Sequence, residues 1–261
     1  MLNKFLNRIK KIFLYCKLKF LINHRPIQKD SVEYLGSSYG GWYLKRDKKL
    51  YSSTIISAGL GEDASFDVEF LNKYNAKVFL VDPTPKAIVH YKSILLNKGK
   101  KRIKRYKKNS GKQDPNSYNL KKVSNNNFIL IEKALFNNNN KLVRFYPPYN
   151  PDHVSCSLKN NSNLKNSTLV KTITVKNIMQ SYNIKKISLI KLDIEGAEIE
   201  VIKNFINDKI FPGQILVEFD ELRNLSKNSI EKFIKIYRLL NKNNYYSYRV
   251  NNFPCFLFIK K

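Results

Sequence analysis

The sequence of 261 residues predicts an α/β fold, a doubly wound, Rossmann-like, seven-stranded mixed sheet with a terminal antiparallel hairpin. Short apolar runs alternate along the chain with segments of helical period, as in folds where strands and helices take turns. The run at 187–192 is mostly apolar, which is typical of a strand buried on both faces of a sheet. The last two runs, about 245–250 and 255–260, are joined through Asn and Pro without a helix, which predicts the antiparallel pair.

Residues 1–33 are predicted to form an appendage to a domain at 34–261. Apolar residues recur there at helical spacing, with Lys and Arg between them: Leu2, Phe5, Leu6, Ile9, Ile12, Phe13, Cys16 and Phe20. The first 29 residues contain no Asp or Glu. This pattern predicts a basic amphipathic helix, with residues 1–22 in peripheral contact with an anionic membrane. Packing of the helix on the domain or on a partner is the alternative.

The sequence gives no sign of export or of a membrane span. Lys17 and Lys19 interrupt what would otherwise be the apolar core of a signal peptide, and no apolar window has the length of a bilayer. The three cysteines are far apart and odd in number, which predicts a reducing compartment. We therefore expect a cytoplasmic protein, in peripheral contact with the cytosolic membrane face.

The elements of the domain follow from the positions of its apolar runs. A lead-in at 34–44, rich in glycine and aromatic residues, is expected to be ordered. Strands are expected at 54–57, 77–81, 128–131, 142–146 (in a small hairpin), 169–175, 187–192, 214–219, 245–250 and 255–260. Helices are expected after the turn at 58–61, at 86–96, at 176–182, from 197 and at 227–241. The Asn- and Ser-rich segment 150–168 is a long loop, which in a compact domain is more often functional than inert.

A basic insertion is expected at about 97–127. Residues 97–125 hold many Lys and Arg against the single acid Asp114, within a chain of formal charge +28. Such a block can mark contact with nucleic acid or an anionic membrane. Lys, Asn and Ile are over-used throughout the sequence, so an AT-biased coding sequence explains the same charge equally well.

Acidic residues are scarce, and many of them follow predicted strands. The acids at or just beyond strand ends are Glu62, Asp63, Asp67, Glu69, Asp82, Glu132, Asp193, Glu195, Glu198, Glu218, Asp220 and Glu221. The carboxyl ends of strands are where open α/β sheets bind ligands. The sequence therefore predicts a cationic or hydroxyl-rich ligand at this edge of the sheet.

Two glycines and one acid predict the kind of cofactor. Gly59 and Gly61 follow the first strand and allow close approach of the backbone to a ligand. Asp82, about twenty residues on, is placed to accept hydrogen bonds from a ribose diol. Glu62 and Asp63 would repel a pyrophosphate, so an adenosine carrying positive charge, S-adenosylmethionine, fits better.

Several segments then resemble the FkbM family of S-adenosylmethionine-dependent methyltransferases, from about residue 35 to the end. They are Lys191-Leu192-Asp193-Ile194-Glu195-Gly196-Ala197-Glu198, the turn from Ser57 to Asp67, Val81-Asp82-Pro83-Thr84-Pro85, His153-Val154-Ser155-Cys156-Ser157 and Val217-Glu218-Phe219-Asp220-Glu221. The resemblance implies the class I methyltransferase fold and methyl transfer to a hydroxyl oxygen of a sugar or a polyketide-like small molecule. Many members have an acid where this chain has Ser57 and a Gly where it has Asp63, which leaves the cofactor contacts of that turn open.

These arguments define the expected site. The residues expected around the cofactor are Ser57, Gly59, Gly61, Asp63, Asp82, Pro83, Glu132 and Asp193, with Glu132 near the adenine or ribose. A hydroxyl acceptor needs a general base, and the candidates are His153, Asp193 and Glu195. His153 is equally well explained as a solvated loop residue. A metal shared by Asp193 with Glu218 or Asp220 has only weak support from spacing, and no metal is predicted.

The function predicted from the sequence is O-methylation of a sugar, glycan or glycolipid precursor, with a small-molecule or glycan acceptor. The alternative is an RNA-binding methyltransferase, or a non-catalytic binding module, that uses residues 97–125, where Tyr106 and Tyr118 interleave the positive charge. No zinc motif or standard nucleic-acid fold signature accompanies that stretch, so nucleic acid is not an expected partner. The loops at 97–127 and 146–168 would select the acceptor, which the sequence does not identify.

Overall fold

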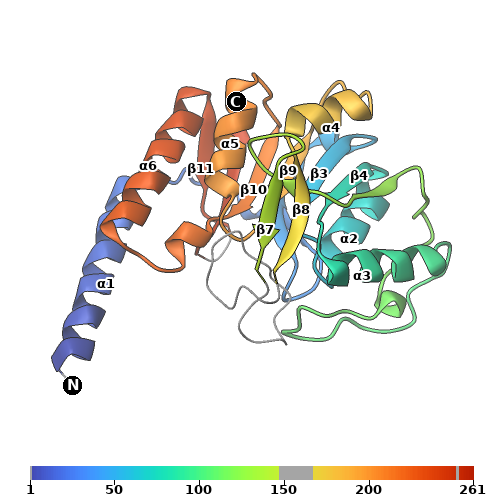
Figure 1. Ribbon diagram of the computed structural model, residues 1–261, viewed down its shortest axis with the longest axis horizontal. Coiled ribbons are helices and arrows are strands. Elements are labelled where there is room, and N and C mark those ends of the chain that lie inside the picture. Colours follow the sequence, from blue (N-terminus) through green and yellow to red (C-terminus); the bar gives the residue numbers. More distant parts are fainter. Residues whose placement is uncertain (1, 147–166, 251–252) are drawn as a thin grey trace.

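The structure, a computed structural model that describes residues 2–146, 167–250 and 253–261, is built on a seven-stranded mixed sheet flanked by helices (Figure 1). The strand order is β11-β12-β10-β9-β3-β4-β5. These strands are β3 (Thr54–Ala58), β4 (Lys77–Val81), β5 (Phe128–Ile131), β9 (Leu189–Leu192), β10 (Gln214–Glu218), β11 (Tyr245–Tyr248) and β12 (Cys255–Lys260). β12 is antiparallel to both neighbours, and the other pairs are parallel. The seven-stranded mixed sheet predicted from the sequence is confirmed.

Both faces of the sheet are buried under helices. Neighbouring strand residues such as Ile55 and Ile56 are both fully buried but belong to two different apolar clusters, because successive side chains point to opposite faces. One cluster contains side chains of α2 (Ser65–Tyr74) and α3 (Pro85–Leu96); the other contains those of α4 (Val175–Ser181), α5 (Glu198–Asn207) and α6 (Lys227–Lys242). This burial on two sides explains why the central strands are continuous apolar runs.

The N-terminal helix α1 (Leu2–Leu21) is partly docked on the domain. Leu14 and Leu18 are buried in the same cluster as α6, while the N-terminal end of the helix projects from the body of the domain (Figure 1). Packing on the domain, given above as an alternative, therefore accounts for one face of the helix. No helix of the described chain is long and apolar enough to cross a bilayer.

A small three-stranded sheet contains β6 (Ala134–Leu135), β7 (Leu142–Phe145) and β8 (Thr168–Ile173). The strands expected at 142–146 and 169–175 are both present. The expected local hairpin at 142–146 is wrong, because β7 pairs antiparallel with β8 beyond residues 147–166, and β6 pairs with β8 instead of β7. The alternation of apolar residues specifies a strand but not its partner.

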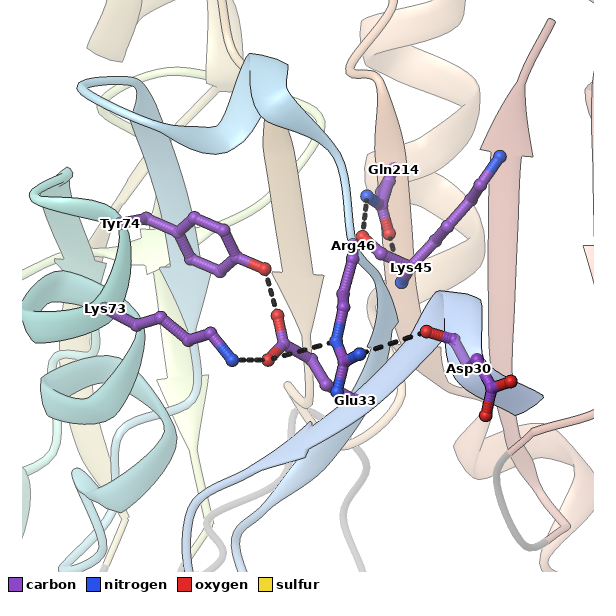
Figure 2. Close-up of polar contacts among 7 residues, drawn as sticks. All are labelled: Asp30, Glu33, Lys45, Arg46, Lys73, Tyr74 and Gln214. Carbon is purple, nitrogen blue, oxygen red and sulfur yellow. Dashed lines mark hydrogen bonds and ion pairs between the residues drawn. The ribbon is translucent and has the colours of Figure 1, made fainter. Parts of the chain in front are cut away.

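The lead-in to the domain is a hairpin of β1 (Val32–Leu35) and β2 (Trp42–Lys45), and the boundary expected at 33/34 falls within β1. Figure 2 shows its two anchors. The buried carboxylate of Glu33 accepts hydrogen bonds from Lys73 and Tyr74 of α2. The side-chain amide of Gln214 accepts from the Lys45 backbone nitrogen at 2.9 Å and donates to its carbonyl oxygen at 2.7 Å. The hairpin is thereby tied to both α2 and β10.

Short 3-10 turns complete the described elements. They lie at Lys29–Ser31, Lys48–Leu50, Pro115–Ser117 and Asp220–Leu222. The third is the one helical turn within the expected insertion at 97–127, which otherwise runs as an irregular loop.

Candidate functional site

A cavity of about 280 Å³ lies at the carboxyl ends of β3, β4, β9 and β10. Of the residues expected at the site, the structure brings seven together in its lining: Gly59, Gly61, Asp63, Asp82, Pro83, Asp193 and Glu195. Leu60, Val81, Leu135 and Phe145 add an apolar part to the wall. The cavity thus combines apolar surface with carboxylates, a combination suited to a ring system that carries polar groups.

Three expected residues lie elsewhere. Ser57 is fully buried beneath the cavity, and Glu132 is exposed at the surface and outside the lining. His153 falls outside the described residues. Among the described residues, no group of three His, Cys, Asp or Glu side chains is close enough to hold a metal.

The turn after β3 requires glycine at its first position. Gly59 has φ +85°, and a Cβ there would lie 1.8 Å from the carbonyl oxygen of Asp193. Only a residue without a side chain allows β3 and β9 to end so close together. Gly61 also has a positive φ, +54°.

Asp82 holds this turn in place. Its Oδ2 accepts hydrogen bonds from the backbone nitrogens of Leu60 (2.9 Å) and Gly61 (3.0 Å). Its Oδ1 accepts from the backbone nitrogen of Thr84 (2.9 Å) and from Thr84 Oγ1 (2.6 Å). A carboxylate has about four lone-pair sites, and here four protein donors occupy them. Asp82 is therefore an anchor of the turn as well as part of the cavity lining.

Asp63 connects the turn to the lead-in hairpin. Its Oδ1 accepts from the backbone nitrogen of Ser65 at 2.9 Å, and its Oδ2 accepts from Ser37 Oγ at 2.5 Å. The following residues Tyr39 and Gly40 line the cavity. The loop between β1 and β2 is thus one wall of the site.

The basic insertion supports the same turn from outside. Gln113 N donates to the carbonyl oxygen of Glu62 at 2.9 Å, and Lys112 forms an ion pair with the Glu62 carboxylate at 3.3 Å. Ala64 N donates to the buried Tyr118 hydroxyl at 3.0 Å, which also lies 2.9 Å from His90 Nε2. Burial lowers the pKa of His90 to about 4, so this histidine is neutral at pH 7 and serves packing.

A buried charged group lies directly below the glycine turn. Lys191 of β9, only 4% exposed, lines the cavity and donates from Nζ to the carbonyl oxygen of Gly59 at 2.9 Å. Its register partner on β3 is Ser57. Asp67 of α2 is buried nearby; burial raises the pKa of its carboxyl and the charge of Lys191 opposes the rise. The Ser57 hydroxyl also interacts with this carboxyl and opposes the rise of its pKa.

The segment after β9 is shaped by Glu198. This buried carboxylate turns back to accept hydrogen bonds from the backbone nitrogens of Gly196 (3.1 Å) and Ile194 (3.2 Å). Burial raises the pKa of Glu198 to about 8. Glu195 has a left-handed backbone, φ +54°, which directs it into the cavity wall. Glu198 thus holds the turn that leads from β9 into α5.

The far end of the cavity contains an ion-pair network. Arg223 approaches Glu218 at 2.5 Å and Glu195 at 3.6 Å. Burial and the charge of Asp193 raise the pKa of Glu218. Among described residues, none donates a hydrogen bond to the Asp193 carboxylate, whereas the network holds Glu195 and Glu218. Asp193 is therefore the carboxylate best placed to receive a ligand.

The sequence reasoning missed Lys191, Arg223 and Tyr39 as site residues. Lys191 breaks an apolar strand run, and this could have been taken as a signal, because a lysine inside a buried strand needs a partner. Arg223 and Tyr39 lie in irregular segments without a motif, so only the structure brings them to the cavity.

Comparison with known protein families finds a match over most of the chain. The model of the methyltransferase FkbM domain matches residues 52–248. The matched range includes every strand of the main sheet except β12, and it includes the glycine turn, Asp82 and the segment after β9. No curated protein matches the chain.

Proposed function

The chain belongs to the FkbM methyltransferase family, and from that premise we propose that it transfers the methyl group of S-adenosylmethionine to a hydroxyl oxygen of a sugar, glycan or glycolipid precursor. The family confirms the resemblance drawn from the sequence and makes the chain a methyltransferase, which argues against a non-catalytic binding module. The methyl donor, the acceptor class and a cytoplasmic location are parts of the proposal. The observation that most supports the proposal is the glycine turn at the cavity, which hydrogen bonds to Asp82 hold in place.

The strand order and the two apolar clusters support the finer fold assignment, a doubly wound sheet of the class I methyltransferase type. Helices α2 and α3 pack with one cluster, and α4, α5 and α6 with the other. In such folds the ligand lies where the strand order reverses, which here is between β3 and β9. The cavity lies at the carboxyl ends of these two strands.

The charges of the cavity support S-adenosylmethionine. Among the described residues, the acids Glu62, Asp63, Asp82, Asp193, Glu195 and Glu218 line it, against the two cations Lys191 and Arg223. Arg223 is held by Glu195 and Glu218. Lys191 is therefore the cation for the cofactor's carboxylate, and the excess of acids suits its ammonium and sulfonium charges. When bound, the cofactor supplies a methyl group on a sulfonium centre.

For Asp82 to contact the ribose, one of its present hydrogen-bond donors must be replaced by a ribose hydroxyl. Both oxygens of Asp82 are occupied, but Thr84 Oγ1 is on a rotatable side chain and is the one donor that can leave without moving backbone. We expect a ribose hydroxyl to take the place of Thr84 Oγ1, while Leu60 and Gly61 keep their hydrogen bonds to Oδ2.

Within the protein, the chemical work is positioning and proton transfer. In-line methyl transfer gains most from orientation and from exclusion of water. The acceptor hydroxyl must lose its proton, and Asp193 is the base we favour, because Glu195 and Glu218 are both paired with Arg223. Tyr39, whose hydroxyl pKa is raised by burial and by Asp193, stays protonated and can donate a hydrogen bond to the acceptor.

Thermal unfolding with S-adenosylhomocysteine tests the cofactor. At about a hundred times its dissociation constant it should stabilise the wild-type chain by roughly 2.7 kcal/mol. Asp193→Asn should reduce this stabilisation, and Glu231→Gln, an exposed acid on α6, should leave it unchanged. If the product does not stabilise the wild type, the cofactor proposal fails. Comparison of glycans from cells with and without the gene, for a mass increase of one methyl group, tests the acceptor class.

A further inference from the structure

Helix α1 carries two apolar faces, and only one of them is docked. Leu14 and Leu18 are 5% and 1% exposed in the core of the domain. Phe13 and Phe20 are 68% and 91% exposed. Residues are separated by about 100° around an α-helix, so the two pairs lie on different sides of the helix, about 130° apart.

The exposed face is a continuous stripe. It contains Ile9, Ile12, Phe13, Cys16 and Phe20, which fall within an arc of about 100°. Exposed apolar residues are normal when they are scattered, whereas a contiguous stripe along a helix marks an interaction surface. We call these five residues the outer stripe of α1.

The charge around the outer stripe favours an anionic partner. Lys17 and Lys19 are exposed and lie on either side of it along the helix surface. No acid occurs in the first 29 residues. Apolar side chains flanked by lysines are the pattern of helices that lie in the interface of an anionic bilayer, because the lysine stems stay on the surface while the ammonium groups reach the headgroups. A second copy of this strongly basic chain would bring like charges together instead.

Tyr15 connects α1 to the edge of the sheet at which the cavity lies. The ring of Tyr15 in α1 contacts that of Phe253, with centroids 5.3 Å apart. Phe253 precedes β12, whose first residue Cys255 is paired with Glu218 of the cavity. From this contact the N-terminal half of α1 continues away from the body of the domain (Figure 1).

We propose that the outer stripe docks α1 on an anionic lipid bilayer and thereby holds the cavity beside the membrane surface. The helix lies in the headgroup region with Phe13 and Phe20 in the lipid, while Leu14 and Leu18 keep it attached to the domain. Docking has a catalytic consequence, which rests on the proposed function: the methyl acceptor is a molecule anchored in that bilayer. Membrane docking itself does not depend on methyl transfer.

The test is sedimentation of the full-length chain with vesicles, without cofactor. Vesicles of phosphatidylcholine mixed with phosphatidylglycerol are compared with pure phosphatidylcholine. The wild type should bind the anionic vesicles at least about tenfold more tightly. Phe13→Gln with Phe20→Gln should reduce that binding by about tenfold or more, since two buried aromatic groups are lost.

Matched controls distinguish docking through the outer stripe from nonspecific binding of any exposed apolar or basic residues. Val89→Gln with Leu96→Gln removes two apolar side chains that are 64% and 83% exposed on α3, and it should leave binding unchanged. Lys17→Gln with Lys19→Gln should weaken binding more than Lys100→Gln with Lys101→Gln in the insertion. Circular dichroism of each variant checks that the fold is kept.

Three results would overturn the proposal. The first is equal binding of wild type and the Phe13/Phe20 variant; the second is an equal loss in the α3 control. The third is a wild-type dimer that the Phe13/Phe20 substitutions convert to a monomer, with no vesicle binding, since the stripe would then pair with a second copy. Stabilisation by S-adenosylhomocysteine is measured separately, so failure of the cofactor proposal and failure of docking give different results.

Discussion

Lys191 and Gly59 are joined by a hydrogen bond from the lysine ammonium group to the glycine carbonyl oxygen, at 2.9 Å. Lys191 lies in β9 and Gly59 directly follows the neighbouring parallel strand β3, where it also meets the Asp193 backbone. The glycine turn and the acidic segment after β9 are therefore one mechanical unit. A substitution in the glycine turn should therefore affect the segment after β9, and a substitution in that segment should affect the turn.

Replacement of Lys191 tests its contact with the carboxylate of the cofactor. Lys191→Met should raise the dissociation constant of S-adenosylhomocysteine by about 10- to 100-fold, because the carboxylate loses its cation. Binding of methylthioadenosine, which lacks the amino-acid portion, should change little. Isothermal titration calorimetry measures both, with Lys203→Met on the exposed side of α5 as control. Equal losses for both ligands would show that Lys191 acts only on the fold.

Gly59 and Gly99 have similar φ angles, so a comparison of alanine substitutions at the two positions measures the cost of the close contact at Gly59 alone. Gly99 has φ +83° and nothing within 4 Å of the place of an added Cβ, whereas Gly59 has φ +85° and faces the Asp193 carbonyl oxygen. Gly99→Ala should cost about 1–2 kcal/mol from backbone strain alone. Gly59→Ala should cost about 4 kcal/mol or more, because the strands must separate. Urea unfolding gives both values, and similar costs would contradict the tight approach.

Asp82 should matter for stability even without a ligand. Asp82→Asn presents an amide where backbone nitrogens need an acceptor, and we expect a loss of about 2–4 kcal/mol in the free energy of unfolding. Thr84→Val removes only one hydroxyl donor and should cost about 0.5–1.5 kcal/mol. If Thr84→Val leaves S-adenosylhomocysteine affinity intact, the proposed exchange with the ribose hydroxyl is supported; a large loss of affinity would argue against it.

Glu198 should make the protein less stable as the pH rises. Its pKa is about 8 in the folded state against an ordinary value of 4.5, so the folded state binds more protons between these values. Stability is therefore fully present below about pH 4.5 and is lost progressively up to pH 8, by at most about 1.4 kcal/mol per pH unit. Glu198→Gln keeps an acceptor for Gly196 and removes the titration.

The measurement is urea unfolding of wild type and Glu198→Gln at several pH values from 5 to 8. The difference between the two proteins cancels other titrating groups, such as His90. It should shift in favour of the variant as the pH rises. A difference independent of pH would place the Glu198 carboxylate in a more solvated setting than its burial indicates.

The strands could be predicted from the sequence because burial on both faces produces continuous apolar runs. The glycine turn and the acids at strand ends could be predicted as well, because few residue types tolerate the backbone at Gly59 or suit a polar edge. Residue type therefore identified Gly59, Asp82 and Asp193 as features of one edge of the sheet.

Other features depend on partners that no local pattern specifies. Glu33 is buried against α2, but its strand is short and carries no strong alternation. The role of Asp82 in holding the turn depends on backbone nitrogens. Nearly every residue has such a nitrogen, so the sequence does not show which ones bind Asp82. The pairing of β7 with β8 crosses residues 147–166, so spacing along the chain misled the expectation of a hairpin.

The hairpin of β1 and β2 supplies Tyr39 and Gly40 to the cavity but precedes residue 52, where the family match begins. A fragment that starts there would keep the strands and the glycine turn and yet lack one side of the site. Leu35, Trp42 and Leu44 anchor the hairpin strands in the core, whereas its loop lies at the cavity, so the loop can diverge without disturbing the sheet. Two relatives with the same matched domain could therefore accept different substrates.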